Sequence, residues 1–556
     1  MILAGLCVAG LAGAPLSPAD AKSFRSDVDA IVQKIETLHP APFAHADRKV
    51  FAADVASIKA TAPQKGLGCA TAELMATVAE LHDGHTYVLP INIPGETRWY
   101  PIRFYAFPDG LYVTSVAPDY ASLVGKKVVK IGSLDADAAL AKAVAMQDAN
   151  NPLAAREGTV WLSQAAIAEA IGAASNGQMT VTVADGASGT ITQSLKPFDA
   201  DVNNAWNQQG EMFGPRMHKD AQAYVTAFGG RGPLDFRKSD PALPPHLRYR
   251  LPYHMVEFPK SRTLYFQWNF VQDWDDEDFA HFSQRLFKTL DAHPDWRLIV
   301  DVRYNSGGDG SKVPGFIKQI VKRDRFDAPG NLFVITGRKT FSAAVDFVGE
   351  AHNWTSAIFV GEPTGAGPNA YGDAQELTTP ALKIPYQVST NYHQHTDLTD
   401  HRDSFAPDIP AVMNGSDYFA GRDPALDSIL SGTDNTLLPI AALGVKDGGA
   451  VAQSAYERRT AEWSQIPWWQ PFGEREMNSA AYELLSGGKG KDAIVLFRMN
   501  TQRYPQSANT WDSLAEAERA AGDVAAAKGD YEKALSINPD TSDAKDALAA
   551  IAKTGK

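Results

Sequence analysis

The 556-residue sequence has only two cysteines, no excess of positive charge and no long apolar run after its first residues. Two cysteines exclude a disulfide-rich scaffold. A formal net charge of −13 argues against nucleic acid as a partner. Without a long apolar run, nothing beyond the N-terminus is expected to span a membrane. What remains is the composition of a globular protein, 44% hydrophobic and 21% charged.

The N-terminus is small-residue-rich and apolar from Met1 to Ala14, and it continues through Pro15 to Ala19-Asp20-Ala21. An apolar run of this length that ends in an A-x-A-like site is typical of a secretory signal, although no basic residues precede it. A buried N-terminal helix is the alternative. We therefore expect an exported protein, periplasmic or secreted. Because Cys7 lies in the signal-like segment, Cys69 would remain as a single thiol without an internal disulfide.

The length predicts two to four domains. Changes in the sequence pattern divide the chain into seven parts. The first four are a signal-like segment (1–21), an N-terminal helical region (22–95), a small α+β module (96–200) and a connecting segment (201–248). An α/β domain (249–444), a Trp/Pro-rich linker (445–475) and a repeated helical part (476–556) follow.

The α/β part alternates apolar strand-like runs with amphipathic helices. Strands are predicted at 263–268, 297–302, 331–335 and 357–360, and helices at 277–293 and 343–354. Alternation of this kind is typical of a mainly parallel sheet with crossover helices.

Ser342 lies where one of these strands passes through a short loop into the helix 343–354. Backbone N–H groups at a helix N-terminus favour developing negative charge, so a serine there can be a nucleophile. It can equally be an ordinary N-cap, because serine is among the preferred capping residues. The segment alone leaves both interpretations open.

A serine nucleophile needs oxyanion donors and a base. Gly307 and Gly308 form a turn at the end of the strand 297–302, and with the amide of Ala343 they can supply the donors. Both turns follow strands predicted to be parallel, so both are expected at the same edge of the sheet. An ordinary tight glycine turn is the alternative.

His85 and a separate group of histidines are the candidate functional histidines. His85 follows Asp83-Gly84 in a short loop that would expose its ring. A second group could bind a metal ion, although the sequence contains no HExxH or similar ligand motif; it comprises His393, His395 and His401 with Asp397 and Asp400.

Four elements in order resemble the S41 peptidases, a family that includes the C-terminal processing proteases, the tricorn core and the interphotoreceptor retinoid-binding repeats. In chain order they are the L-x-D-G-H-T element Leu81–Thr86, the D-x-R-x-N-x-G-G turn Asp301–Gly308, the nucleophile segment Ser342-Ala343 with Gly361-Glu362-x-Thr364, and the x-P-D-I turn Phe405–Ile409. The resemblance covers most of residues 23–443. It implies a crotonase/ClpP-like α/β fold, a PDZ-like module at 96–200, peptide or unfolded protein as substrate, and no cofactor or metal.

Processing proteases pair the serine with a lysine, but Gly367 stands in the lysine's place here. The tricorn-like branch instead uses a histidine, which by resemblance is His85. That branch also places a glutamate before the x-P-D turn. This chain has Asp400 and Asp403 there, so the resemblance makes Asp403 the candidate that orients His85, with Asp400 and Asp83 as alternatives. Asp301, Arg303 and Asp408 are interpreted as structural.

The C-terminal part repeats at an interval of 34 residues, which relates Gly488 to Gly522 and Tyr504-Pro505 to Asn538-Pro539. This period is typical of tetratricopeptide units; an ordinary pair of helical hairpins is the alternative. Such units would bind a protein partner or a second copy of the chain.

The leading hypothesis is therefore an exported serine peptidase with Ser342 and His85 as its catalytic pair. A binding protein on the same fold, without catalysis, is the main alternative. A scaffold acting through the repeats and a metallohydrolase acting through the His393 group are further ones.

Overall fold

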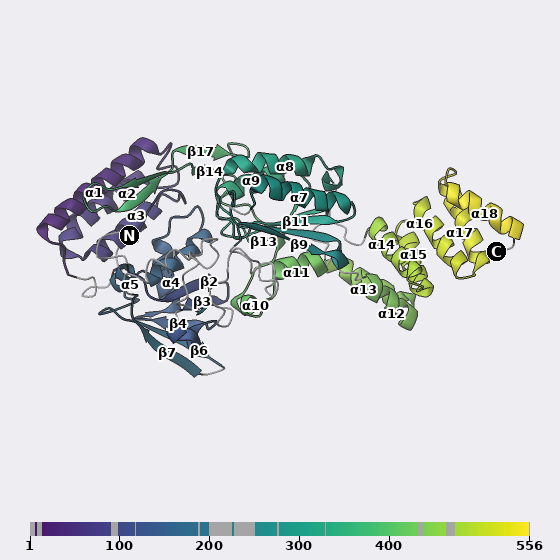
Figure 1. Cartoon of the computed structure of the whole chain (residues 1–556), viewed down its shortest axis with the longest axis horizontal. Helices are drawn as coiled ribbons and strands as arrows, with labels where there is room; N and C mark the ends of the chain where they lie inside the picture. The colour runs from purple at the N-terminus through teal and green to yellow at the C-terminus, as the bar shows by residue number, and fades with distance from the viewer. Residues whose placement is uncertain are drawn as a thin grey trace. The chain divides into compact units, whose positions relative to one another are not determined.

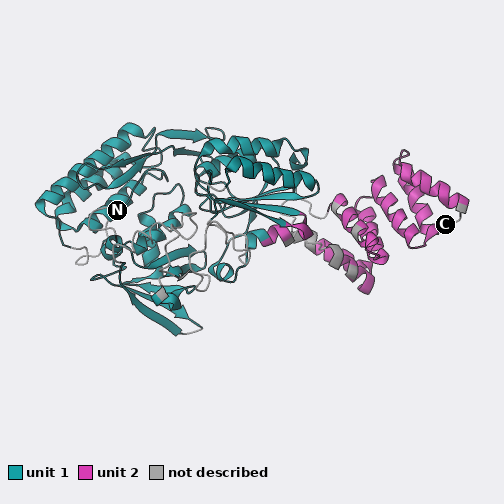
Figure 2. Ribbon diagram, viewed as in Figure 1, with its two compact units in different colours: residues 1–257, 263–426 teal, residues 258–262, 427–556 magenta. Residues whose placement is uncertain are grey.

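The computed structural model describes residues 6–7, 14–90, 98–116, 118–186, 189–198, 225–226, 251–274, 277–327, 330–431, 437–462 and 473–554. They form two compact units (Figure 2). Unit 1 comprises residues 1–257 and 263–426, and unit 2 comprises residues 258–262 and 427–556. The predicted α/β domain, 249–444, thus extends past the end of unit 1, and most of the predicted connecting segment 201–248 lies outside the described residues.

Three helices, α1 (Pro18–Leu38), α2 (Arg48–Thr61) and α3 (Leu67–Ala79), form the N-terminal region. Side chains cap the first two helices: Ser17 accepts from the amide of Asp20, and Asp47 accepts from the amide of Lys49. Ala21, the last residue of the A-x-A-like site, is buried within α1. None of the described helices is long and apolar enough to cross a membrane.

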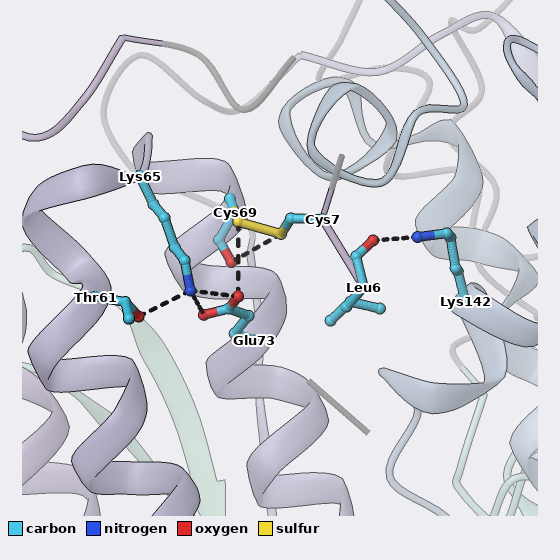
Figure 3. The surroundings of a disulfide bond; sticks show 7 residues. All are labelled: Leu6, Cys7, Thr61, Lys65, Cys69, Glu73 and Lys142. Carbon is cyan, nitrogen blue, oxygen red and sulfur yellow. Dashed lines mark hydrogen bonds and ion pairs between the residues drawn. A yellow bond between two sulfur atoms is a disulfide. The ribbon is translucent and has the colours of Figure 1, made fainter. Parts of the chain in front are cut away.

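Cys7 and Cys69 form a disulfide, with their Cα atoms 6.0 Å apart (Figure 3). The expectation of a single unpaired thiol at Cys69 is therefore wrong for this structure. The Cys7 segment is held at a second point, because the carbonyl of Leu6 accepts a hydrogen bond from Lys142. These contacts join residues 6–7 to α3 and to the α+β module, which a signal-like composition does not predict.

The α+β module (residues 99–195) has two small antiparallel sheets. One contains β2 (Ile102–Phe107), β3 (Gly110–Val116) and β8 (Val225–Thr226). The other has the order β5 (Leu134–Asp135), β4 (Val128–Ile131), β6 (Met179–Asp185) and β7 (Gly189–Leu195). Helices α4 (Ala136–Ala145) and α5 (Ala165–Ile171) and the 3₁₀ segment η3 (Ala154–Ser163) complete it. The segment thus contains both strands and helices, as predicted for an α+β module.

The largest sheet has the order β18-β13-β12-β11-β10-β9. Its strands β13, β11 and β9 are labelled in Figure 1. Its strands are Ile409–Pro410, Ile358–Gly361, Leu332–Thr336, Arg297–Asp301, Thr263–Trp268 and Tyr253–Phe258. The pairs from β10 to β18 are parallel, as predicted. Every residue of β12 is buried, which explains its continuous apolar run.

Three helices follow strands of this sheet: α7 (Phe279–Ala292), α8 (Val313–Val321) and α9 (Ala343–Trp354). Aromatic side chains of the sheet and the helices share one core, where Trp268 stacks on Phe279 at 4.5 Å between ring centroids. The predicted helix 343–354 is confirmed at both ends.

Short strands connect the N-terminal region to this domain. β1 (Tyr87–Val88) pairs with β16 (Pro385–Val388), which also pairs with β15 (Gln375–Thr378). A separate ribbon joins β14 (Asn369–Gly372) to β17 (Asn391–Gln394). Because β1 directly follows His85-Thr86, the β1–β16 pairing places the histidine loop beside a segment about 300 residues later in the chain.

Helix α10 (Gly415–Phe419) lies in unit 1, whereas α11 (Pro424–Ser431) begins in unit 1 and ends in unit 2. The rest of the described C-terminal part of unit 2 is helical. It contains α12 (Leu437–Asp447), α13 (Gly449–Glu462), α14 (Glu474–Ser486), α15 (Gly490–Arg503), α16 (Ala508–Ala520), α17 (Val524–Ile537) and α18 (Ser542–Thr554). The predicted linker 445–475 thus begins within helices, and its tryptophans at 463, 468 and 469 lie outside the described residues. The tetratricopeptide assignment stays a prediction.

Candidate active site

Ser342 occupies a strained turn between β12 and α9. Its backbone angles are φ 53° and ψ −132°, a left-handed region that residues with a side chain seldom adopt. An ordinary N-cap is extended and its side chain accepts a hydrogen bond from the helix, whereas Ser342 makes no capping bond through its side chain. Its main-chain carbonyl accepts instead, from Val345 at 2.7 Å. The hydroxyl is therefore not committed to capping, which the sequence left open.

The glycine turn after β11 supports this strained residue. Gly307 (φ 105°) and Gly308 (φ 133°) both have backbone angles that favour glycine. A Cβ added at Gly307 would lie 2.6 Å from the Cβ of Ser342, and one added at Gly308 would lie 2.2 Å from the carbonyl oxygen of Val271. Only glycine permits this approach, so the turn requires glycine for its close packing against Ser342 as well as for its backbone angles.

The three predicted oxyanion donors differ in availability. The amide of Gly307 donates to Asn305 Oδ1 at 2.9 Å, so it is already engaged. The amides of Gly308 and Ala343 donate to no acceptor among the described residues. Both residues line the cavity described below. We therefore retain Gly308 and Ala343 as candidate donors and remove Gly307 from the set.

The histidine loop is organised by the carboxylate of Asp83. Its Oδ1 accepts from the amide of His85 at 3.0 Å, while its Oδ2 accepts from Thr86 at 2.6 Å, from Ser389 at 2.7 Å and from the ring of His39 at 3.0 Å. Burial acts to raise the pKa of this carboxyl, but the hydrogen bonds from His39, Ser389 and Thr86 outweigh burial and lower the pKa to about 2. Asp83 is thus an ionised structural anchor.

The ring of His85 stacks on Phe341, the residue before Ser342, with 4.3 Å between centroids and 27° between planes. Gly84 makes room for this, because a Cβ there would lie 2.7 Å from the Phe341 ring. Burial lowers the pKa of His85, although the charge of Asp83 and the backbone of Tyr371 act in the opposite direction. The neutral ring, which can accept a proton, is therefore favoured near pH 7.

Ser342 and His85 line one cavity of about 430 Å³. Its walls come from the carboxyl edge of the main sheet, the first turn of α9 and the ribbon β14–β17. Among the lining residues are His85, Gly308, Ser342, Ala343, Asp346, Gly367, Tyr371, Asp373, His393 and His395. The structure thus brings together the predicted nucleophile, the predicted base and two predicted donors, which come from distant parts of the chain.

Neither a family model nor a curated protein matches this sequence. Several solved structures, however, are similar to this chain in fold. A variant of CPAF superposes with a TM-score of 0.51 at 10% identity, covering 74% of this chain and 97% of that one. The photosystem II D1 C-terminal processing protease matches with a TM-score of 0.33 at 13% identity, covering 74% and 97%, and the tricorn protease with 0.32 at 12%, covering 75% and 37%. These proteins are S41-family peptidases.

The chain has the S41 peptidase fold. The similarity to CPAF decides this at the level of the fold alone, because the identities are too low to carry residue roles from one chain to the other. The expected α/β class with a mainly parallel sheet is confirmed.

The backbone around Gly367 explains why this position holds glycine. A Cβ at Gly367 would lie 2.0 Å from the carbonyl oxygen of Arg402, so no side chain fits without movement of the backbone. Gly367 nevertheless lines the cavity. The position at which the sequence resemblance would place a lysine therefore has no room for a side chain.

Asp403, the candidate orienting acid, does not line the cavity. Its side chain is exposed and accepts from Ser404 at 3.1 Å, and its main-chain carbonyl accepts from Asn151. The alternative Asp400 pairs with Arg402 at 2.7 Å. The structure thus does not bring Asp403 to His85, and the carboxylate on the histidine loop is that of Asp83.

The histidines of the suggested metal group do not stay together. His393 and His395 line the cavity and pair with Asp373 at 3.3 Å and with Asp346 at 2.8 Å, whereas His401 is exposed and does not. Among the described residues, the group of ligand atoms close enough for one ion is Cys7, Cys69 and Glu73, whose cysteines are joined by the disulfide.

Sequence reasoning overlooked Asp346 and Phe341. Asp346 lies in the first turn of α9, four residues after Ser342, and both residues line the cavity; this spacing is visible in the sequence. Phe341 directly precedes the serine, but its stacking on His85 depends on a contact between distant segments, for which the sequence carries no signal.

Proposed function

We propose that this chain is a serine peptidase on the S41 fold, with Ser342 as nucleophile and His85 as its base. The observation that carries the proposal is that an uncapped, strained serine and a histidine favoured in its neutral form line the same cavity. A neutral imidazole accepts the proton of the hydroxyl as it attacks a carbonyl carbon, and it returns that proton to the leaving amine.

Negative charge then develops on the carbonyl oxygen of the substrate. The amides of Gly308 and Ala343 line the cavity without acceptors of their own among the described residues, and Ala343 begins a helix whose N-terminus favours negative charge. The backbone of Tyr371 interacts with the ring of His85 and favours its protonated form. In this scheme the ring is oriented by Tyr371 and by its stacking on Phe341, and Asp83 holds the loop.

The substrate class we propose is peptide or unfolded protein. The direct test is hydrolysis of an unstructured polypeptide by wild type and by His85→Ala. Loss of the base should lower kcat/KM by roughly 10³-fold or more while the protein stays folded. Equal activity of the two proteins would contradict the role of His85.

A binding protein without catalysis is the second candidate, and the exposure of Asp403 favours it, because the acid expected to orient the histidine does not line the cavity that His85 lines. A fluorophosphonate, which modifies only an activated serine, distinguishes the two candidates. Labelling of Ser342 supports the peptidase, and an unlabelled serine in folded protein supports the binding protein.

Export is part of the proposal. The small-residue-rich N-terminus is typical of a signal, and the Cys7–Cys69 disulfide is of a kind that persists in oxidising compartments. The two features make different predictions about residues 1–21, because cleavage after Ala21 would remove Cys7. Fractionation with N-terminal mass analysis of the mature protein tests both.

We also propose that the helices 474–554 bind a protein partner or a second copy of the chain. The support is their repeat period and a hydrophobic core that they share with α12 and α13, which contains Met477, Leu496, Phe497 and Leu514. If residues 476–556 are deleted, hydrolysis of a short peptide should persist while partner binding or self-association is lost. Loss of peptide hydrolysis would instead show that these helices support catalysis.

A further inference from the structure

The segment Asn150–Glu157 of the α+β module contacts the histidine loop directly. Asn150 Oδ1 accepts a hydrogen bond from the amide of Gly84 at 3.2 Å, next to His85. A Cβ added at Gly84 would lie 2.8 Å from the same oxygen. The loop is therefore held between Asn150 on one side and the ring of Phe341 on the other.

The next residue, Asn151, is buried and connects the module to the segments that follow β13. Its Nδ2 donates to the carbonyls of Thr364 and Asp403, each at 3.0 Å, and its Oδ1 accepts from the amide of Ala154, the first residue of η3. The same short segment thus leads into η3 and bonds to Thr364 and to Asp403, whose backbone lies next to Gly367.

Glu157, one turn further along η3, reaches the nucleophile turn. Its carboxylate pairs with Arg338 at 2.8 Å and with Lys339 at 3.7 Å. The Arg338 side chain is 2% exposed, its guanidinium lies 4.0 Å from the centroid of the Tyr105 ring, and it donates to the carbonyl of Ala106. The turn that ends in Ser342 is therefore fastened to the module by a buried, charged contact.

η3 itself is held in the module by hydrogen bonds and close packing. Thr159 donates to the carbonyl of Phe104, and Gly158 allows close packing on α4, because a Cβ there would lie 2.4 Å from the carbonyl oxygen of Ala143. One segment of the module is thus bonded both to the His85 loop and to the turn that leads to Ser342.

We propose that Asn150 and Glu157 are positioning residues, which hold the His85 loop and the Ser342 turn in the relative placement that catalysis needs. This inference rests on the proposed serine peptidase function. Its physical basis is that a misplacement of about 1 Å at the reacting groups lowers the rate by about 10²-fold. The α+β module is then a structural part of the active site.

The first experiment compares Asn150→Ala with Asn150→Asp. The alanine variant removes the acceptor for the Gly84 amide, and the aspartate variant keeps it. We expect kcat to fall by about 10–100-fold in Asn150→Ala with KM changed by less than about 3-fold, and Asn150→Asp to recover most of the loss. Asp185→Asn, which breaks the surface pair with Lys126 in the same module, is the control and should match wild type. Equal kcat in wild type and Asn150→Ala would overturn the role of Asn150.

The second experiment tests Glu157 by the rate of fluorophosphonate labelling of Ser342. Glu157→Gln keeps a hydrogen-bond acceptor for Arg338 but removes the charge, and Glu157→Ala removes both. Labelling should slow in the order wild type, Glu157→Gln, Glu157→Ala at equal folded concentration. If Glu157→Ala does not fold, the glutamine variant decides, and a wild-type labelling rate in it overturns the role of Glu157.

A third measurement does not depend on catalysis. The ring of His85 can be titrated by NMR in wild type and Asn150→Ala, with His85→Gln for assignment. The charged and titratable groups that act on the ring are Asp83 on its own loop, Asp346 on α9 and His393 on β17. Burial lowers the pKa of His85, so release of the loop should move the pKa up towards the ordinary value near 6.5. An unchanged titration contradicts the positioning role even if the protein proves not to be a peptidase, and an inactive wild type with a shifted titration contradicts only the peptidase.

Discussion

The turns after β11 and β12 end at the same edge of one parallel sheet, but their polar groups are used in opposite ways. After β11, Arg303 is bonded to Asp301 and, through two nitrogens, to both carboxylate oxygens of Asp423 at 2.7 and 2.8 Å. Asp301 also accepts from Tyr265 at 2.6 Å. After β12, the side chain of Ser342 makes no capping bond, and its backbone is strained.

The difference shows which polar residues hold the site and which are left free to react. The β11 turn uses its charges to fix a shape, including the close approach of Gly307 to Ser342. The β12 turn keeps a hydroxyl without a structural task, in a conformation that the surroundings maintain; the amide of Phe341, for example, donates to the carbonyl of Asn305 at 3.0 Å. The comparison predicts that changes in the first turn act on stability and changes in the second act on activity.

The largest effect is expected at Ser342. Ser342→Ala should lower kcat/KM by roughly 10⁴-fold or more because it removes the nucleophile. Ser342→Gly should be equally inactive but more stable than the alanine variant by about 1 kcal/mol, since glycine adopts a positive φ without strain. Peptide hydrolysis and thermal unfolding measure the two effects. A serine variant that keeps its activity would remove the distinction between the two turns.

Asp423→Asn tests the other turn. It leaves the buried Arg303 with one carboxylate in place of two, so the free energy of unfolding should fall by about 3 kcal/mol. Activity per folded molecule should change much less than in Ser342→Ala. Denaturant unfolding, with activity assayed well below the transition, checks this. A loss of activity without a loss of stability would mean that the β11 turn has a chemical role.

The carboxylate of Asp83 extends the comparison to the histidine loop. Its pKa is about 2 in the folded protein against an ordinary value of about 3.9. Its contribution to stability is therefore complete above about pH 5, begins to fall near pH 3.9 and is lost as the pH falls through about 2. The loss should be about 2 kcal/mol. Unfolding measured from pH 5 to pH 2 should show this loss in wild type and not in Asp83→Asn; the same pH dependence in both would contradict the anchor role.

The smallest effect is expected at Asp403. Because its carboxylate is exposed and bonded to Ser404, Asp403→Ala should change kcat/KM by less than about 3-fold. A steady-state assay beside His85→Ala measures this. A loss comparable to that of His85→Ala would restore Asp403 as the acid that orients the histidine.

Local sequence patterns predicted the elements that carry Ser342. The run Leu332–Thr336 is buried throughout, and α9 spans Ala343–Trp354 as its periodicity predicts. The conformation of Ser342 was not predictable, because capping and nucleophilic serines share the same position in the chain. Its φ of 53° and its uncapped side chain depend on the close approach of Gly307.

Long-range contacts explain the rest of the differences. The pairing of Val88 with Tyr386 brings His85 to the site, and no local pattern contains that pairing. Asp403 was chosen from the order of motifs, whereas its exposure is set by local bonds around Arg402 and Ser404. The disulfide between Cys7 and Cys69 was missed because composition alone assigned Cys7 to a signal.

The most direct test of the central claim is peptide mapping by mass spectrometry after treatment with a fluorophosphonate near pH 7.5. From the proposed pairing of Ser342 with His85 we expect a single adduct on Ser342 in wild type, much slower labelling in His85→Ala, and wild-type labelling in Asp403→Ala. Folded wild-type protein that carries no adduct on Ser342, or equal labelling with and without His85, would contradict it.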